Sequence, residues 1–309
     1  AIFLVGGTAA GEKCTALVLS GGGSKGSYEA GVLWGLYYGT DQKEDYQYDV
    51  VTGVSAGAIN AGVIAIYGPG EEEAMLDYLS FNWQNISSSS VFKQWKPLGV
   101  VTGLFEKSGI FDTSALTESL NESLAPFDVK RKMMVACVDA SSGSYHLFNE
   151  TTSSLVKSVV SSASIPFAFP TTVWKEDEGD DIVCMDGGTV WNVNMVSAVE
   201  RCREQVDSDS DITVDIVFTK SYKLSNKTHL DNALANFFRF RDIKTYTKDL
   251  ADIYKFMRAF PEVNFRHLVM PDEPLFGTGI NTINFDNATS TFPMQMQGRE
   301  DGARAVNET

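Results

Sequence analysis

The sequence predicts an α/β fold in which a mainly parallel central sheet is covered by helices on both faces. Short apolar runs alternate along the chain with longer segments of helical periodicity, and glycines end several of the apolar runs. Strands that are buried on both faces appear in a sequence as near-continuous apolar runs. Helices between such strands allow the strands to run parallel, and the alternation therefore favours this class of fold.

The first four elements lead to the most informative motifs. Residues 15–20 form an expected strand that ends in glycines, and residues 25–38 follow as a helix with apolar side chains on one face. Residues 48–52 form a second expected strand, which stops at Gly53, and residues 56–67 follow as a buried helix rich in Ala, Ile and Val. Each strand therefore passes through a glycine-containing turn into a helix.

The alternation continues through the rest of the chain, without an internal repeat. A serine-rich stretch at residues 87–90 is expected to be a loop. Residues 231–260 are expected to form one long helix, because their apolar side chains recur close to every 3.6 residues. The remaining expected elements are helices over residues 113–124, 155–164 and 192–206 and strands over residues 133–139, 182–185 and 213–219.

Length and composition fit one large domain. A chain of 309 residues can bury a substantial core, and no stretch shifts into linker composition. We therefore expect a single domain over residues 12–309, preceded by a short segment at residues 1–11. This segment is either the tail of a signal peptide, with small residues placed for cleavage before Gly11, or a mature N-terminal strand. No apolar run approaches the roughly 20 residues of a membrane span.

The net charge of -15 argues against a nucleic-acid partner, because a phosphate backbone would be repelled. The same charge disfavours purely electrostatic docking on anionic lipid, so peripheral membrane contact would need apolar side chains or a local basic patch. Residues 237–241, with the sequence Phe-Phe-Arg-Phe-Arg, have the composition of such a patch. The same pattern also fits an aromatic stripe of a helix packed on the sheet.

Glycosylation sequons point to the secretory pathway. Six Asn-x-Ser/Thr sequons are present, more than random placement after 15 asparagines would give, and none has proline in the middle. We expect a glycosylated protein that is secreted or lumenal; if the sequons are unused, the alternative is a cytoplasmic protein. The sequons lie at Asn85, Asn121, Asn149, Asn226, Asn287 and Asn307.

The four cysteines, Cys14, Cys137, Cys184 and Cys202, leave two alternatives open. In an oxidising compartment they permit three full pairings, whereas elsewhere they would be buried free thiols. Neither a C-x-x-C motif nor a Cys/His cluster is present, so we expect no metal site and no cofactor.

The strongest single motif is Gly53-Val54-Ser55-Ala56-Gly57, between an expected strand and an expected helix. A sharp strand-to-helix turn needs small residues two before and two after the serine, because a side chain there would clash with neighbouring backbone. The turn exposes the serine hydroxyl at the N-terminus of the helix, where the helix dipole stabilises negative charge. Ser55 is therefore the candidate nucleophile.

A second glycine cluster follows the first strand. It fits neither the P-loop pattern nor a dinucleotide-binding fingerprint, and a row of backbone N–H groups beside a nucleophile is better interpreted as an oxyanion hole. The lysine within it either assists or neutralises a nearby carboxylate, and the alternative for the whole cluster is a turn that packs the helix closely on the sheet. The cluster comprises Gly21, Gly22, Gly23, Ser24, Lys25 and Gly26.

A serine hydroxyl needs a base to take its proton. The three histidines, His146, His229 and His267, do not follow strands beside small residues, so we expect them to be ordinary surface or core side chains. Asp186 is the better candidate, because it ends the strand at residues 182–185 and precedes Gly187 and Gly188. A strand end of this kind places a carboxylate at the carboxyl edge of a parallel sheet, where α/β folds gather their sites.

Taken together, these blocks resemble the patatin-like phospholipases. The resemblance rests on residues 16–31, the turn at 51–62, the Ser-Ala-Ser-Ile-Pro run at 162–166 with Phe169-Pro170, and Asp186-Gly187-Gly188, in that family's order and with similar spacing. Asn192 also matches a polar position of the family, and the resemblance covers about residues 14–306. It is carried by four motifs that occur together.

The resemblance implies a three-layer α/β/α fold and hydrolysis of lipid acyl esters, of phospholipase A or lysophospholipase type, by a Ser-Asp dyad without a metal. By position Ser55 is the nucleophile and Asp186 the base, and the backbone N–H groups of Gly22, Gly23 and Ser24 form the oxyanion hole. Two residues depart from the family pattern: Lys25 stands where many members have Arg, and Asn194 stands where Pro is frequent.

Two other functions remain open at this point. One is a non-catalytic lipid-binding or structural protein that keeps the fold, and it would be favoured by a misaligned dyad or a blocked site. The other is a peptidase or small-ester esterase, because the fold alone does not select the acyl donor. The expected partner is an acyl lipid, and neither the lipid nor the acyl position follows from the sequence.

Overall fold

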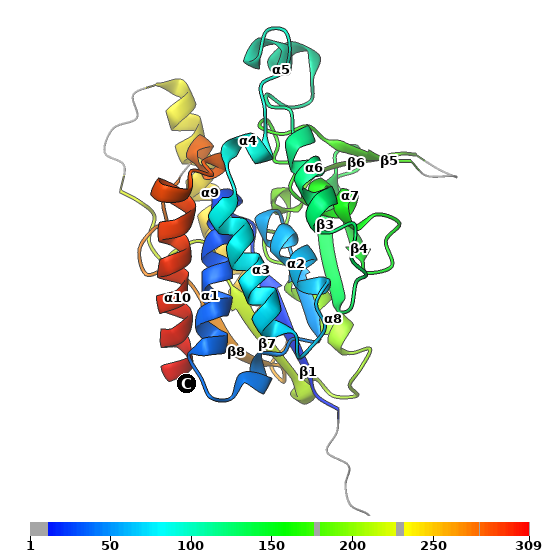
Figure 1. Cartoon of the computed structure of the whole chain (residues 1–309), viewed down its shortest axis with the longest axis vertical. Helices are drawn as coiled ribbons and strands as arrows, with labels where there is room; N and C mark the ends of the chain where they lie inside the picture. The colour runs from blue at the N-terminus through cyan, green and yellow to red at the C-terminus, as the bar shows by residue number, and fades with distance from the viewer. Residues whose placement is uncertain (1–11, 176–179, 227–231, 278, 309) are drawn as a thin grey trace, which may run out of the picture.

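The computed structural model describes residues 12–175, 180–226, 232–277 and 279–308. It has three layers, with a central sheet between two groups of helices (Figure 1). The predicted three-layer α/β/α architecture with a mainly parallel sheet is confirmed. The expected N-terminal segment at residues 1–11 lies outside the described residues.

The sheet runs in the order β5-β6-β3-β2-β1-β7-β8, and β4 pairs with β3. The neighbours from β3 to β8 pair in parallel, whereas β4, β5 and β6 pair antiparallel. The strands are β1 (Cys14–Leu19), β2 (Val50–Gly53), β3 (Lys132–Asp139), β4 (Tyr145–Asn149), β5 (Thr172–Trp174), β6 (Ile182–Asp186), β7 (Ile212–Val217) and β8 (Asn264–Val269).

Successive residues of β1 explain the continuous apolar pattern of the central strands. Leu17 and Leu19 pack into the core formed with α1, α2, α3 and α7, whereas Ala16 and Val18 pack into the core formed with α8 and α9. Both faces of the strand are therefore buried. The helices are α1 (Gly26–Tyr38), α2 (Ala56–Ala65), α3 (Glu72–Asn85), α4 (Ser88–Val91), α5 (Val100–Glu106), α6 (Ser114–Ser123), α7 (Leu155–Ser162), α8 (Met195–Cys202), α9 (Ala233–Ala259) and α10 (Phe292–Asn307).

Two expectations about local structure were wrong. Residues 87–90 were expected to be a loop, but Ser87 caps the short helix α4, and the side chains of Ser87 and Ser90 satisfy each other's backbone N–H groups. The strand before Asp186 was expected to run parallel to its neighbours, but β6 pairs antiparallel with β3, with Cys137 opposite Asp186. Asp186 therefore reaches the level of Ser55 from the opposite direction.

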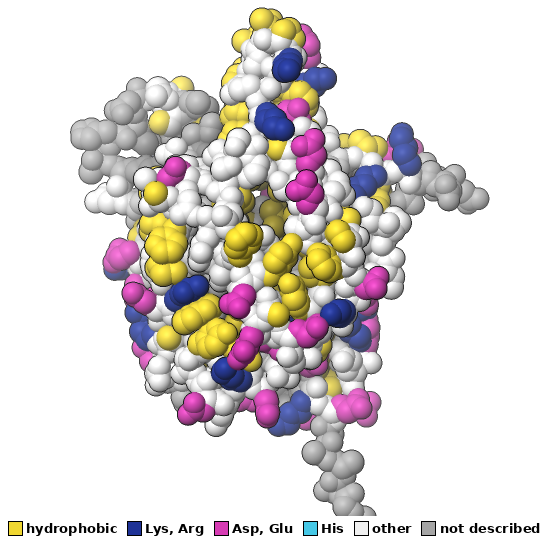
Figure 2. Space-filling model, viewed as in Figure 1, with side chains coloured by type: hydrophobic (Ala, Val, Ile, Leu, Met, Phe, Trp, Pro, Cys, Tyr) yellow, Lys and Arg dark blue, Asp and Glu magenta, His cyan; other side chains and the backbone are white. Residues whose placement is uncertain are grey.

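The chain carries a net charge of -15. On the face shown in Figure 2 the acidic side chains are dispersed among neutral and apolar ones rather than gathered in one patch. Within the described residues, every helix is too short or too polar to span a membrane.

All four cysteines are paired. One disulfide joins Cys14 at the start of β1 to Cys202 at the end of α8, and the other joins Cys137 of β3 to Cys184 of β6. Of the alternatives that the sequence leaves open, the structure therefore has one full pairing and no free thiol. The second disulfide holds the strand that carries Asp186 beside the centre of the sheet.

The two disulfides differ in the length of chain that they close, with sequence separations of 188 and 47 residues. All four cysteines are fully buried, so replacement by alanine leaves similar cavities. We expect the Cys14→Ala/Cys202→Ala pair to lower the free energy of unfolding by about 1 kcal/mol more than Cys137→Ala/Cys184→Ala, because the longer loop restricts the unfolded chain more. Denaturant unfolding of the oxidised proteins measures both, and a larger loss for the shorter loop would contradict the entropic origin.

Candidate active site

Ser55 occupies a strained turn between β2 and α2. Its backbone has φ 56° and ψ -121°, a conformation that non-glycine residues adopt rarely and at a cost of about 1–3 kcal/mol. A Cβ on Gly53 would lie 2.1 Å from the Gly57 carbonyl oxygen, and one on Gly57 would lie 2.6 Å from the Leu19 carbonyl oxygen. The two glycines therefore allow the sharp turn, and the Ser55 N–H donates to the Ser162 hydroxyl at 3.0 Å.

The glycine loop after β1 lies directly against this turn. A Cβ on Gly21 would lie 3.1 Å from the Cβ of Ser55, and Gly23 has a φ of 60°. Among the described residues, the backbone N–H groups of Gly22, Gly23 and Ser24 have no protein acceptor. Gly21, Gly22 and Gly23 line the cavity in front of Ser55, whereas Ser24 is buried behind them. The loop thus presents free donors next to the serine.

Asp186 ends β6 on the other side of Ser55. Its carboxylate is buried and accepts the N–H of Gly188 at 2.7 Å. Burial raises the pKa of the Asp186 carboxyl to about 6, while the neighbouring Ser55 hydroxyl, the hydrogen bond from Gly188 and the charge of Arg241 lower it. A carboxylate with this pKa is ionised at neutral pH and still basic enough to take a proton.

Two asparagines fix the loop between Asp186 and α8. Asn192 donates its side-chain N–H to the Gly21 carbonyl oxygen and accepts the Gly21 N–H on its own carbonyl, both at 3.1 Å. Asn194, at the position where the family often has Pro, accepts the Ser197 N–H at 3.4 Å and so begins α8. The departure from the family pattern is therefore compensated locally, and the glycine loop and the Asp186 loop are tied together.

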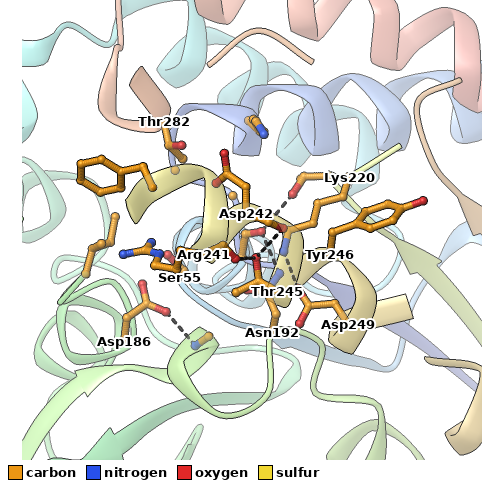
Figure 3. Close-up of a pocket in the computed structure, with 18 of the residues that line it drawn as sticks. Ser55, Asp186, Asn192, Lys220, Arg241, Asp242, Thr245, Tyr246, Asp249 and Thr282 are labelled. Carbon is orange, nitrogen blue, oxygen red and sulfur yellow. Dashed lines mark hydrogen bonds and ion pairs between the residues drawn. The ribbon is translucent and has the colours of Figure 1, made fainter. Parts of the chain in front are cut away.

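These elements open onto a cavity of about 470 Å³ that Ser55 and Asp186 share. Ser55, Asp186 and Arg241 lie together on one side of it, opposite Lys220 and Asp249 (Figure 3). Part of the wall is apolar. This part is formed by Ile165, Pro166, Phe167, Ala168, Leu224, Phe238, Leu275 and Ile283.

The cavity is also lined by lysine and arginine side chains that the sequence motifs did not indicate. Lys220 donates to Asp249 at 2.5 Å. Burial, and to a smaller extent the charge of Lys220, lower the pKa of Lys25 to about 8, against the opposing charge of Asp242. Lys220 and Asp242 are therefore the charged groups that affect the pKa of Lys25.

Arg241 and Phe167 are site residues that the motifs did not reveal. Arg241 was noted only as part of the aromatic and basic stretch at residues 237–241, and its role at Asp186 requires α9 to fold across the cavity. In that stretch Phe237 and Phe240 are exposed, while the ring of Phe238 meets Phe167 at 6.4 Å between centroids. The expectation that this stretch packs as an aromatic stripe on the sheet was therefore wrong for Phe237 and Phe240.

The two histidines that the structure describes lie outside the cavity. His267 lies on β8, and its ring nitrogen Nε2 is 3.0 Å from the Tyr46 hydroxyl. His146 lies on β4, and neither histidine lines the cavity. His229 lies outside the described residues. Across the described parts of the chain, no group of three or more His, Cys, Asp or Glu side chains is placed to hold a metal ion.

The three-layer fold and this cavity define an α/β protein in which a serine on a strained turn and a buried carboxylate share one cavity. The family described as patatin-like phospholipase matches residues 17–199, more than half of the 309 residues, and the chain belongs to that family. Among solved structures, the crystal structure of VipD from Legionella pneumophila is similar at 12% identity and a TM-score of 0.47, over 96% of this chain and 67% of VipD. The comparison with curated proteins found no match.

Proposed function

We propose that this protein is a serine acyl hydrolase of the phospholipase A or lysophospholipase type, in which Ser55 and Asp186 form a catalytic dyad. The observation that carries the proposal is the strained Ser55 turn facing a buried carboxylate inside a largely apolar cavity. Strain of this kind persists where the surrounding structure enforces it, and it is frequent at active sites. Membership of the family supports a lipid ester as the substrate.

The reaction proceeds in two steps. Asp186 takes the hydroxyl proton of Ser55 as the Oγ atom attacks the ester carbonyl carbon. The negative charge that develops on the carbonyl oxygen is held by the free N–H groups of Gly22 and Gly23, which line the cavity, whereas Ser24 does not line it. The protonated Asp186 then gives its proton to the departing alcohol, which leaves an acyl group on Ser55. Water, activated by Asp186, attacks this ester and releases the fatty acid.

Labelling with a fluorescent fluorophosphonate tests the dyad directly. We expect the wild-type protein to be labelled and both Ser55→Ala and Asp186→Asn to lose the label, because the first lacks the reacting oxygen and the second lacks the base. The variant Ser114→Ala, which changes an exposed serine, serves as the control and should label like wild type. A folded wild-type protein that stays unlabelled would favour the non-catalytic lipid-binding alternative.

The charge of Arg241 contributes to the lower pH limit of the proposed reaction. Its positive charge lowers the pKa of Asp186, so Arg241→Gln should raise that pKa and move the acid limb of the pH–kcat/KM profile upward by about half a unit. Arg258→Gln removes the same charge from the exposed far end of α9 and is the matched control. An unchanged acid limb in Arg241→Gln, measured on a soluble ester, would remove Asp186 as the titrating group.

We also propose that the protein is glycosylated and belongs to the secretory pathway. Pairing of all four cysteines supports an oxidising compartment. Four of the six sequon asparagines, Asn85, Asn121, Asn226 and Asn307, are exposed, as glycosylation requires. Asn287 is less accessible than these four, because it is half-buried and its side-chain N–H donates to the Gln84 carbonyl oxygen.

A further inference from the structure

A projection between α4 and α6 carries apolar side chains that the body of the protein does not bury. We call residues 95–107, which contain α5, the α5 knob; it extends beyond the rest of the molecule in Figure 1. Phe105 is 84% exposed, and Figure 2 shows hydrophobic side chains over the tip of the projection, with acidic and basic side chains beside and beneath them. The exposed apolar residues of the knob are Leu98, Val100, Val101, Leu104 and Phe105.

The knob is held in place without these side chains. A Cβ on Gly103 would lie 2.5 Å from the Ile110 Cα, so α5 packs on the chain through its glycine face. The Trp95 indole N–H donates to the Gly109 carbonyl oxygen at 3.0 Å, and Thr102 is buried. Because the apolar tip plays no part in these contacts, it is free to meet a partner.

The charge around the tip is opposite to that of the whole protein. The knob itself contains Lys96 and Lys107 and one acidic residue, Glu106, which gives it a net charge of +1 in a chain of net charge -15. At its base Lys93 lies opposite Asp112 and is paired with Glu118 at 3.8 Å. Lys107 stacks over the Trp95 ring, 5.1 Å from its centroid, and all three lysines are exposed. A convex apolar tip with a basic collar matches a lipid surface with anionic headgroups.

The knob is attached to the wall of the candidate active site. The chain leaving it bonds to the segment that lines the cavity, with the Ile110 N–H donating to the Phe167 carbonyl oxygen and the Phe111 N–H to that of Ala168, both at 3.0 Å. Phe167 is itself half exposed and meets Phe238 of α9. The knob is thus joined by backbone hydrogen bonds to the part of the cavity wall formed by Phe167 and Ala168.

We propose that the α5 knob is an interfacial anchor that inserts Leu104 and Phe105 into an anionic lipid surface and holds the cavity mouth against it. The inference rests on the proposed function, because a lipid ester that reaches Ser55 must leave a membrane or another lipid aggregate. The apolar tip enters the acyl boundary, and the lysines meet phosphate and carboxylate groups at the headgroup level. The acidic remainder of the protein stays in water.

Sedimentation of the whole chain with vesicles tests the anchor, in a Ser55→Ala background that leaves the lipid intact. We expect Leu104→Ser/Phe105→Ser to weaken binding to mixed phosphatidylcholine–phosphatidylserine vesicles at least about tenfold. Lys96→Gln/Lys107→Gln should weaken it by about tenfold on these vesicles and much less on pure phosphatidylcholine. Phe81→Ser/Val196→Ser, which changes exposed apolar residues outside the knob, is the matched control and should bind like the parent.

A second readout separates the anchor from catalysis. With Ser55 intact, Leu104→Ser/Phe105→Ser should hydrolyse a dissolved short-chain ester within about twofold of wild type but lose about tenfold on vesicle phospholipid. If the knob variant loses vesicle binding but the wild-type protein cleaves no ester, the proposed function is overturned and the proposed anchor is supported. The proposed anchor is overturned if the knob variant and the control bind vesicles equally. It is also overturned if the wild-type protein is a dimer and the knob variant is a monomer.

Discussion

The Ser55→Ala variant is expected to fold like the wild-type protein and to lose at least about 10³-fold in kcat on lipid esters. The substitution removes only the oxygen that forms the acyl-enzyme, and the cavity, the glycine loop and Asp186 remain. Initial-rate measurements on phospholipid with titration of the released fatty acid give kcat. Retention of wild-type kcat would exclude Ser55 as the nucleophile.

A companion variant, Ser55→Gly, tests the strain in the same turn. Alanine keeps a Cβ at φ 56° and therefore keeps the strain, whereas glycine adopts this conformation freely. We expect Ser55→Gly to be as inactive as Ser55→Ala and more stable to unfolding by about 1 kcal/mol. Equal stabilities would mean that the turn stores no strain at Ser55.

The parts of the fold that the sequence predicted are those encoded by neighbouring residues. β1, α1, β2 and α2 follow from apolar runs separated by glycine turns, and the Ser55 turn follows from the spacing of Gly53 and Gly57. The donors at Gly22 and Gly23 are equally local, because they are backbone groups of one short loop. Such features need no knowledge of distant contacts.

The direction of β6 and the role of Arg241 depend on tertiary structure instead. A short apolar strand carries no signal that distinguishes parallel from antiparallel pairing. In the structure β6 pairs with β3 and is also joined to it by the Cys137–Cys184 disulfide. Arg241 reaches Asp186 only because α9 crosses the cavity. Likewise the apolar tip of α5 has no core-facing periodicity, because α5 packs through Gly103 and leaves its larger side chains outside.

Asp186 is expected to reduce the stability of the folded protein wherever it is ionised. Its folded-state pKa of about 6 lies above the usual 3.8, so the folded chain binds this proton more tightly than the unfolded chain does. Stability from this group is therefore fully present below about pH 4 and is lost as the pH rises to about 6. A difference of about two pKa units corresponds to about 3 kcal/mol.

The Asp186→Asn variant removes this titration and keeps an oxygen for the Gly188 N–H. We expect it to lose at least about 10³-fold in kcat, because an amide cannot take the Ser55 proton. We compare the free energy of unfolding of the variant with that of wild type. The variant should gain about 3 kcal/mol relative to wild type between pH 4 and pH 7, and the difference should stay constant above pH 7. Denaturant unfolding at a series of pH values measures this difference.

Asp139 provides a control, because the pKa of its carboxyl is shifted in the opposite direction. Hydrogen bonds from Ser141 and Ser142 hold the pKa of the Asp139 carboxyl well below its usual value, so ionised Asp139 stabilises the folded protein and the effect disappears as the pH falls. Asp139→Asn should therefore lose stability relative to wild type as the pH rises. If the Asp186→Asn difference does not change with pH, Asp186 titrates at its usual value in the folded protein. It would then be too weak a base near neutral pH for the role proposed here.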